Sequence, residues 1–319
     1  MKVLLDADTG VDDALGIMYL AHAQRQGLVD VLAVGTVGGN IHVDLSTRNT
    51  LRMLELSGLA IPVAKGANKP LLEPLHAAAH VHGTDGLAET NLTPPRTQET
   101  GEHAVDQILR LSREHAGELV LLAFGPLTNL GVAFVRDPGL AKRVKRVVLM
   151  GGSTQSGNVT ATAEANIAND PEAARMVFLS GAPITMVGLN VTHQTYFVEE
   201  DFGALKQIGN ERSRFVLNLM HFMMNAYAKF GYEPPICVLH DPLSAGVCVH
   251  ADVAQCKRLF VDVETDGRFT RGMTVVDSRL KPSSEPNVDV VSEVHVKPFL
   301  AAMMDALVWW ANLDGGRVS

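Results

Sequence analysis

Short apolar runs rich in Val and Leu alternate with segments of helical periodicity along most of the chain. The first run, at 3–5, precedes apolar positions whose spacing predicts a helix over 12–26. The same alternation predicts further strands within 29–39, 61–66, 118–127, 144–152 and 183–191, and helices from near 43 and over 100–115, 127–136 and 171–180. Buried strands that alternate with helices are typical of a mostly parallel sheet covered on both faces. We therefore predict an α/β fold with an open, Rossmann-like sheet.

The pattern changes after about residue 195. Helical periodicity covers 199–230, and strand-like runs follow at 259–264, 271–277 and 288–296, with the pair Asp266-Gly267 as a turn between the first two. A final helix is predicted to begin near Pro298. These runs predict a C-terminal mixed or antiparallel extension of the sheet. Because no linker, repeat or low-complexity tract separates the two parts, we expect a single domain over 1–319.

Polar or glycine-rich turns follow most of the predicted parallel strands. In an open α/β sheet, ligands bind in the crevice at the carboxyl ends of the strands. The predicted strands end at Asp8, at 38–40, at 124–129, at 150–152 and at 188–190. The sequence His240-Asp241-Pro242 opens a later helical pattern. We expect all of these turns to face one edge of the sheet.

Four aspartates, Asp6, Asp8, Asp12 and Asp13, lie where the first strand gives way to the first helix. Carboxylates this close repel one another unless positive charge lies between them, and carboxylate oxygens are the ligands of calcium and magnesium. Helix capping explains Asp12 or Asp13, because a helix N-terminus favours carboxylates, but it does not explain Asp8. The cluster therefore favours a metal site and an enzyme.

Two other interpretations fit part of this stretch. LLDADT matches the start of haloacid-dehalogenase-like phosphatases, in which Asp6 would be the nucleophile and Asp8 the acid, but the later residues of that family do not follow in order. An EF-hand would need a glutamate at the twelfth loop position, which is missing.

Composition and charge narrow the range of partners. The chain is 46% apolar and 19% charged, with a formal net charge of −8 and no basic run. This balance argues against nucleic acid and anionic membrane, and it suits a small neutral or cationic substrate. The three cysteines show neither metal spacing nor a disulfide framework, which indicates reduced thiols. With too short an N-terminal apolar stretch for a signal peptide and no bilayer-length segment, we expect a cytoplasmic protein.

The stretch DADTGVDDALGI resembles the D-x-D-x-G-x-D-D signature of the nucleoside hydrolases, the inosine-uridine preferring nucleoside N-ribohydrolase family. Segments similar to further motifs of that family follow in order: VHGTDGL at 81–87, AFGPLTNL at 123–130, MGGS at 150–153, GNVTATAEANIANDPEAA at 157–174 and HDPL at 240–243. Six ordered matches make the resemblance specific. Thr9 stands where the family usually has proline, and Ala165 where many members carry an aromatic residue.

The resemblance implies Ca²⁺-dependent hydrolysis of pyrimidine or inosine-type ribonucleosides to free base and ribose. It implies four metal ligands, namely Asp8, Asp13, Asp241 and the backbone carbonyl of Phe124. The metal would lower the pKa of a water, and Asp8 would accept its proton as the water attacks C1′. His240 would donate a proton to the leaving base. The implied substrate contacts are Asp12, Asn40, His82, Met150, Asn158, Glu164 and Asn166.

Other features of the chain complete these expectations. His76 and His80 have the helical spacing of a zinc pair but lack the adjacent glutamate, so we assign His82 to the base pocket and the other two to the surface. The segment 223–235 is either a lid over the site or an ordinary helix end. The resemblance suggests a homodimer or homotetramer. A non-catalytic nucleoside-binding protein on the same scaffold, and the phosphatase, stand as alternatives.

Overall fold

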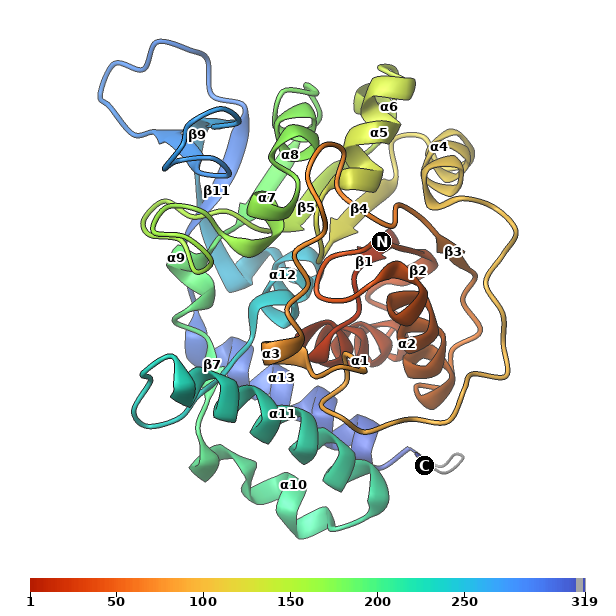
Figure 1. The fold of residues 1–319 in the computed structure, drawn as a ribbon. Coiled ribbons are helices and arrows are strands. Elements are labelled where there is room, and N and C mark those ends of the chain that lie inside the picture. The colour runs from red at the N-terminus through yellow and green to blue at the C-terminus, as the bar shows by residue number, and fades with distance from the viewer. Residues whose placement is uncertain (314–317, 319) are drawn as a thin grey trace.

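The computed structural model describes residues 1–313 and 318 and shows a central sheet with helices on both sides (Figure 1). Within these residues, nine strands form the sheet in the order β10-β9-β11-β6-β5-β4-β1-β2-β3. The strands from β11 to β3 run parallel, and β9 and β10 add two antiparallel pairings at one end. The predicted fold class, a mostly parallel sheet with an antiparallel C-terminal extension, is confirmed.

The strands of the sheet are short, as is usual for a parallel α/β core. Their bounds are β1 Lys2–Ala7, β2 Asp30–Thr36, β3 Val63–Lys65, β4 Leu119–Ala123, β5 Arg146–Met150, β6 Ile184–Val187, β9 Ala254–Val263, β10 Thr274–Asp277 and β11 Val288–Val294. A separate antiparallel pair is formed by β7 Tyr196–Phe197 and β8 Cys237–Val238.

Helices connect these strands and cover both faces. They are α1 Val11–Arg25, α2 Val43–Leu56, α3 Ala79–His82, α4 Ala104–Glu114, α5 Thr128–Arg136, α6 Leu140–Arg143, α7 Ala165–Asn169, α8 Pro171–Phe178, α9 Leu189–Thr192, α10 Gly203–Ile208, α11 Glu211–Lys229, α12 His240–Val249 and α13 Val296–Ala311, with 3₁₀ turns η1 Glu199–Phe202 and η2 Ala251–Val253. In the part of the chain that the structure describes, no helix is both long and apolar enough to cross a membrane.

Most predicted elements occur within a few residues of their predicted positions, and the differences have local causes. The helix predicted from residue 100 begins at Ala104, because the His103 side chain caps it by accepting a hydrogen bond from the Val105 N–H. The last helix begins at Val296 instead of near Pro298. The short α7, α9 and the β7–β8 pair were not predicted, since two to five residues show no clear periodicity.

The first strand is buried on both faces. Val3 and Leu5 join the hydrophobic cluster beneath α1, α11, α12 and α13, whereas Leu4 joins the cluster beneath α4, α5 and α8. Successive strand residues point to opposite faces, so an unbroken apolar run is what a sheet covered twice requires. Figure 1 shows these two sets of helices on opposite sides of the sheet.

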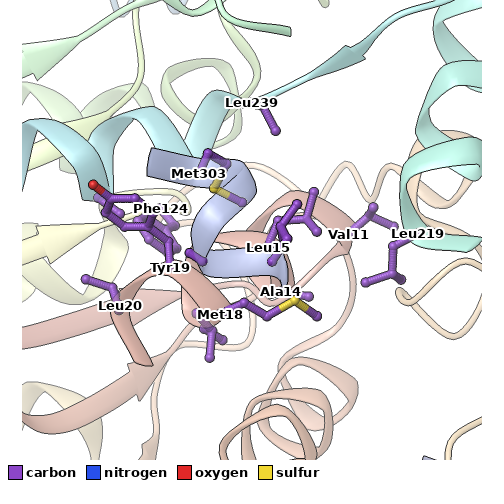
Figure 2. Close-up of a cluster of buried hydrophobic side chains, with 14 of the residues drawn as sticks. Val11, Ala14, Leu15, Met18, Tyr19, Leu20, Phe124, Leu219, Leu239 and Met303 are labelled. Atoms are coloured by element: carbon purple, nitrogen blue, oxygen red, sulfur yellow. The ribbon is translucent and has the colours of Figure 1, made fainter. Parts of the chain in front are cut away.

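Helix α1 is buried nearly all round, which fixes the position of its first turn. Figure 2 shows Val11, Leu15 and Met18 of this helix in a cluster that also contains Leu239, before α12, and Met303 of α13. A helix that is apolar on every side is typical of a protein interior. The aspartates at its N-terminus therefore sit on a rigid support at the carboxyl edge of the sheet.

Candidate active site

A cavity of about 330 Å³ opens at the carboxyl ends of the parallel strands. Its lining comes from the ends of β4 and β5, the 156–159 loop, and α3, α7, α11 and α12. Ten of the twelve predicted site residues line it, namely Asp12, Asn40, His82, Phe124, Met150, Asn158, Glu164, Asn166, His240 and Asp241. The other two, Asp8 and Asp13, are fully buried next to these residues. The structure thus gathers all predicted site residues in one place.

Buried carboxylates form the floor of this cavity. One carboxylate oxygen from each of Asp12, Asp13 and Asp241 lies within 4.8 Å of the others. Asp241 belongs to the first turn of α12, more than two hundred residues from the other two in the chain. Two members of this group, Asp13 and Asp241, are predicted metal ligands. The third, Asp12, is predicted from the sequence to contact the sugar.

Asp8 lies beside this group at the end of β1. Its Oδ2 accepts a hydrogen bond of 2.6 Å from the Asn40 N–H, while its Oδ1 is buried without a hydrogen-bond partner among the described residues. A Cβ at Gly39 or Gly125 would collide with this carboxylate, so both turns need glycine to approach it. The backbone thus encloses Asp8 and leaves one oxygen available.

The unpartnered oxygens fit a hard cation. Oδ1 of Asp8, Asp12 and Asp13 each lacks a hydrogen-bond partner within the described structure, although all three are buried. A buried polar atom without a partner is costly, and a buried carboxylate is more so. Oxygen ligands from several carboxylates are the donor set that calcium and magnesium prefer. These aspartates can therefore hold a metal ion.

The electrostatics of the cluster support the same conclusion. Burial, and after it the charge of Asp13, raises the pKa of Asp12 to about 8. Burial also raises the pKa of Asp8 and of Asp241, and neighbouring aspartates raise both further. A cation among these groups would reverse the repulsion and favour the ionised carboxylates.

Asn166 and Glu164 order the wall next to the metal-binding group. Asn166 Nδ2 donates to the backbone carbonyl of Phe124 at 2.5 Å and to that of Met150 at 3.2 Å. Glu164 caps α7, where its carboxylate accepts from the N–H groups of Asn166 and Ile167. It also accepts from Gly152 N–H at 2.9 Å. Glu164 therefore links the N-terminus of α7 to the turn that follows β5.

His82 enters the cavity from α3 as a neutral ring. Its Nδ1 accepts a hydrogen bond of 3.1 Å from the Val11 N–H, which places the ring proton on Nε2. Burial lowers the pKa of His82 to about 3. His76 and His80 are exposed, as predicted, although His80 also reaches the rim of the cavity.

Both ring nitrogens of His240 are engaged inside the protein. Nδ1 lies 2.8 Å from Oγ1 of Thr192, and Nε2 lies 2.6 Å from the hydroxyl of Tyr227. Burial lowers the pKa of His240 to about 3, and burial raises that of Tyr227 well above its usual value. Tyr227 and His240 thus line the cavity together and contact each other. The sequence did not predict this contact and gave no signal for Thr192.

The predicted lid divides into two parts. Helix α11 continues to Lys229, and its residues Met223 and Tyr227 are buried, so the first part is a packed helix. Phe230 and Tyr232 follow the helix and line the cavity, with 54% of Phe230 exposed. The second part thus forms an aromatic wall at the mouth of the cavity.

Asp6, the remaining aspartate of the cluster, faces away from the cavity. Its Oδ1 accepts a hydrogen bond of 2.9 Å from Asn129 Nδ2, which also donates to the Thr36 carbonyl. Asp6 is thus tied to the packing between β2 and α5.

A cavity at the carboxyl edge of a parallel sheet, with buried aspartates that can hold a metal ion, is the arrangement of an α/β enzyme site. The sequence model of the inosine-uridine preferring nucleoside hydrolases matches residues 3–301. The chain belongs to this family, whose members are N-glycosidases that act on ribonucleosides. It is therefore not a phosphatase of the haloacid-dehalogenase type.

Individual relatives cover nearly the whole chain. The chain is 34% identical over 309 residues to an inosine-uridine preferring nucleoside hydrolase of Leishmania major, covering 96% of this chain and 97% of that one. It is 37% identical over 314 residues to the pyrimidine-specific ribonucleoside hydrolase RihA of Shigella flexneri, covering 98% and 99%. The structure of a purine-preferring ribonucleoside hydrolase from Gardnerella vaginalis superposes with a TM-score of 0.92 at 30% identity, covering 98% and 100%. The names of these relatives differ in the preferred base.

Proposed function

We propose that this protein hydrolyses the N-glycosidic bond of pyrimidine or inosine-type ribonucleosides to free base and ribose, with Ca²⁺ as cofactor. The observation that carries the proposal is the set of buried, unpartnered carboxylate oxygens at the floor of a cavity of nucleoside size. Family membership supplies the reaction class.

The residues that would hold the ion are Asp8, Asp13, Asp241 and the carbonyl of Phe124, and Asp12 lies within the same group of oxygens. A bound divalent ion would bring a water molecule to the cavity floor and lower its pKa. The Phe124 carbonyl accepts one hydrogen bond from Asn166 and retains a second lone pair for an ion.

Asp8 is the proposed general base. Its Oδ2 is fixed by the Asn40 N–H, so its free Oδ1 can accept the proton of the attacking water. The new bond forms between the water oxygen and C1′ of the ribose as the bond from C1′ to the base breaks.

The sugar would lie between the carboxylate floor and the wall that contains Asn158 and Glu164. The transition state of glycoside cleavage carries positive charge on the sugar ring, and nearby carboxylates stabilise it. The proposed sugar contacts are Asp12, Asn40, Met150, Asn158, Glu164 and Asn166.

The leaving base needs a proton or a hydrogen bond, and the geometry supports the Tyr227 hydroxyl, held by His240, as the donor. Because both His240 nitrogens are engaged, the hydroxyl of Tyr227 is the group that can reach a base in the cavity. The Tyr227 hydroxyl would donate a hydrogen bond to the leaving base while it accepts one from Nε2–H of the neutral His240 ring. His82 would bind the base from the opposite side through Nε2–H.

The test is base release from uridine, cytidine, inosine and adenosine, measured with and without a chelator and after readdition of Ca²⁺ or Mg²⁺. Release from uridine, cytidine or inosine that stops with chelator and returns with Ca²⁺ supports the proposal. Binding without release would leave only a nucleoside-binding protein. Full activity in chelator would remove the proposed cofactor.

Assembly as a homodimer or homotetramer, and residence in the cytoplasm, stay predictions from the sequence. Sedimentation analysis and localisation of a tagged chain test them separately from the chemistry.

A further inference from the structure

A connecting segment, residues 66–78, crosses the carboxyl edge of the sheet between β3 and α3, and we call it the strap. Figure 1 shows it in orange, passing next to α7 on its way to α3. It contains neither helix nor strand, and residues 72–74, 76 and 77 are exposed. A segment with so little buried surface gains little from packing, so its position depends on hydrogen bonds.

The junction of α7 and α8 holds the strap through two side chains. Asn169 Oδ1 accepts a hydrogen bond of 3.1 Å from the His76 N–H, and Asn169 Nδ2 donates to the His76 carbonyl at 3.4 Å. Asp170 Oδ2 accepts from the Leu71 N–H at 3.0 Å. The two bonds to His76 are the only ones that the backbone of residues 72–77 makes to another segment of the described structure. Asn169 is therefore the main attachment of this part of the strap.

Asn169 is the last residue of α7 and is only 8% exposed. Its Nδ2 also donates to the carbonyl of Ala165 at 3.3 Å, which fixes the orientation of the amide. Asn166, three residues earlier in the same helix, donates to the carbonyls of Phe124 and Met150. Helix α7 therefore connects the strap to the ends of β4 and β5, where the wall of the cavity begins.

The strap leads directly into α3, which brings His80 and His82 to the cavity. Of the four residues of α3, only His82 is buried. A single helical turn is not stable by itself, so neighbouring segments must hold it. Between His76 and α3, the Ala78 N–H donates to the Asn40 carbonyl at 2.8 Å. The attachments at His76 and Ala78 therefore fix how α3 approaches the cavity.

We propose that Asn169 is a positioning residue for nucleoside binding, because its side-chain amide holds His76 of the strap and thereby keeps α3 in place across the cavity from α7. Asn169 does not line the cavity, so it acts on a ligand only through α3 and His82. This inference deepens the proposed function and rests on it, since it names a residue that orders the same site. A residue that acts in this way affects binding of the nucleoside more than the chemical step.

The first experiment measures kcat and KM of the full chain with Ca²⁺ for uridine and inosine. Asn169→Leu keeps a side chain of similar size and removes both hydrogen bonds to His76. We expect KM to rise by about fivefold, the value of one hydrogen bond, with kcat within about twofold of the wild type. Asn169→Asp keeps the acceptor for the His76 N–H and loses the donor, so its KM should lie between those of the wild type and Asn169→Leu.

The second experiment measures amide hydrogen exchange of the same variants without nucleoside. In Asn169→Leu, the amides of residues 72–82 should exchange about threefold faster or more, whereas amides of the central strands should keep their wild-type rates. Asn312→Leu is the matched control. Asn312 is exposed, and its Nδ2 donates only to the Val308 carbonyl of its own helix, so neither KM nor exchange of the strap should change.

The outcomes separate this inference from the proposed function. If the wild type cleaves uridine or inosine but Asn169→Leu has unchanged KM and unchanged exchange at 72–82, the inference is overturned and the proposed function stands. A fall of kcat at constant KM, or faster exchange throughout the chain with a lower melting temperature, would also overturn it. If the wild type cleaves no nucleoside, the proposed function fails and the role of Asn169 in nucleoside binding fails with it.

Discussion

The hydroxyl of Tyr227, on α11, lies 2.6 Å from Nε2 of His240, on the first turn of α12. On the other side of the ring, the hydroxyl of Thr192 lies 2.8 Å from Nδ1. His240 is therefore held between Thr192 of α9 and Tyr227 of α11, and its orientation depends on both helices.

Replacing Tyr227 by Phe removes this connection and keeps the ring. We expect kcat for uridine or inosine to fall by about 100-fold, because a positioned proton donor contributes about that much. Steady-state kinetics measures the loss, and KM should change little. A rise of KM with a fall of kcat and a lower melting temperature would instead indicate a packing role.

Thr192→Val should leave the volume of the side chain nearly unchanged and remove the partner of His240 Nδ1. We expect kcat to drop by about three- to tenfold, the value of one hydrogen bond, with Thr192→Ser close to wild type. The pair of variants is compared by kinetics and by circular dichroism. Equal activity of Val and Ser variants would show that the hydroxyl is not used.

Asp8→Asn should reduce kcat by about 1,000-fold, because the amide cannot accept the proton of water. Since the substitution removes one of several repelling carboxylates, the fold should persist with a melting temperature at or above that of the wild type in chelator. Asp6→Asn is the matched control, two residues earlier in the same strand, where an amide oxygen can still accept from Asn129. Near-normal turnover in Asp8→Asn would eliminate it as the base.

Without metal, stability should fall as the pH rises. Burial raises the pKa of Asp6 to about 7 and that of Asp12 to about 8. A carboxyl whose pKa is higher in the folded state stabilises the fold while protonated, and this stability is lost as pH rises through the folded pKa. In chelator we expect a higher melting temperature at pH 5 than at pH 8, measured by calorimetry.

Calcium at pH 8 should restore the melting temperature, and Asp12→Asn should reduce the pH dependence in chelator. A melting temperature in chelator that rises between pH 5 and pH 8 would contradict the assignment of Asp6 and Asp12 as buried carboxyl groups with raised pKa values.

Gly16 of α1 ties the helix to the end of β4. A Cβ there would lie 2.8 Å from the ring of Phe124, whose carbonyl is a proposed metal ligand. Gly16→Ala should therefore lower both stability and Ca²⁺ affinity, although alanine favours a helix by about 1 kcal/mol. Gly203→Ala, at the start of α10 with open space around the new methyl, is the control and should stabilise. Thermal unfolding measures the stability of both variants, and calcium titration measures their Ca²⁺ affinity.

The sequence by itself determined the fold class and which segments meet at the cavity. The unbroken apolar run at 3–5 specified a strand buried on both faces, and the rule that ligands bind at strand ends brought Asp8, Asn40 and Met150 to one edge. These inferences succeeded because they rest on local periodicity and on a topology that parallel sheets share.

Tertiary structure alone decided how the site residues contact one another. The engagement of His240 by Thr192 and Tyr227 joins three helices, and no spacing along the chain encodes it. The same holds for the position of Asp12 among the carboxylates that can hold a metal, and for Glu164 as a helix cap as well as a wall of the cavity. Whether two groups from distant segments form a hydrogen bond depends on differences of a few tenths of an ångström in their separation. Packing of the whole core sets that separation.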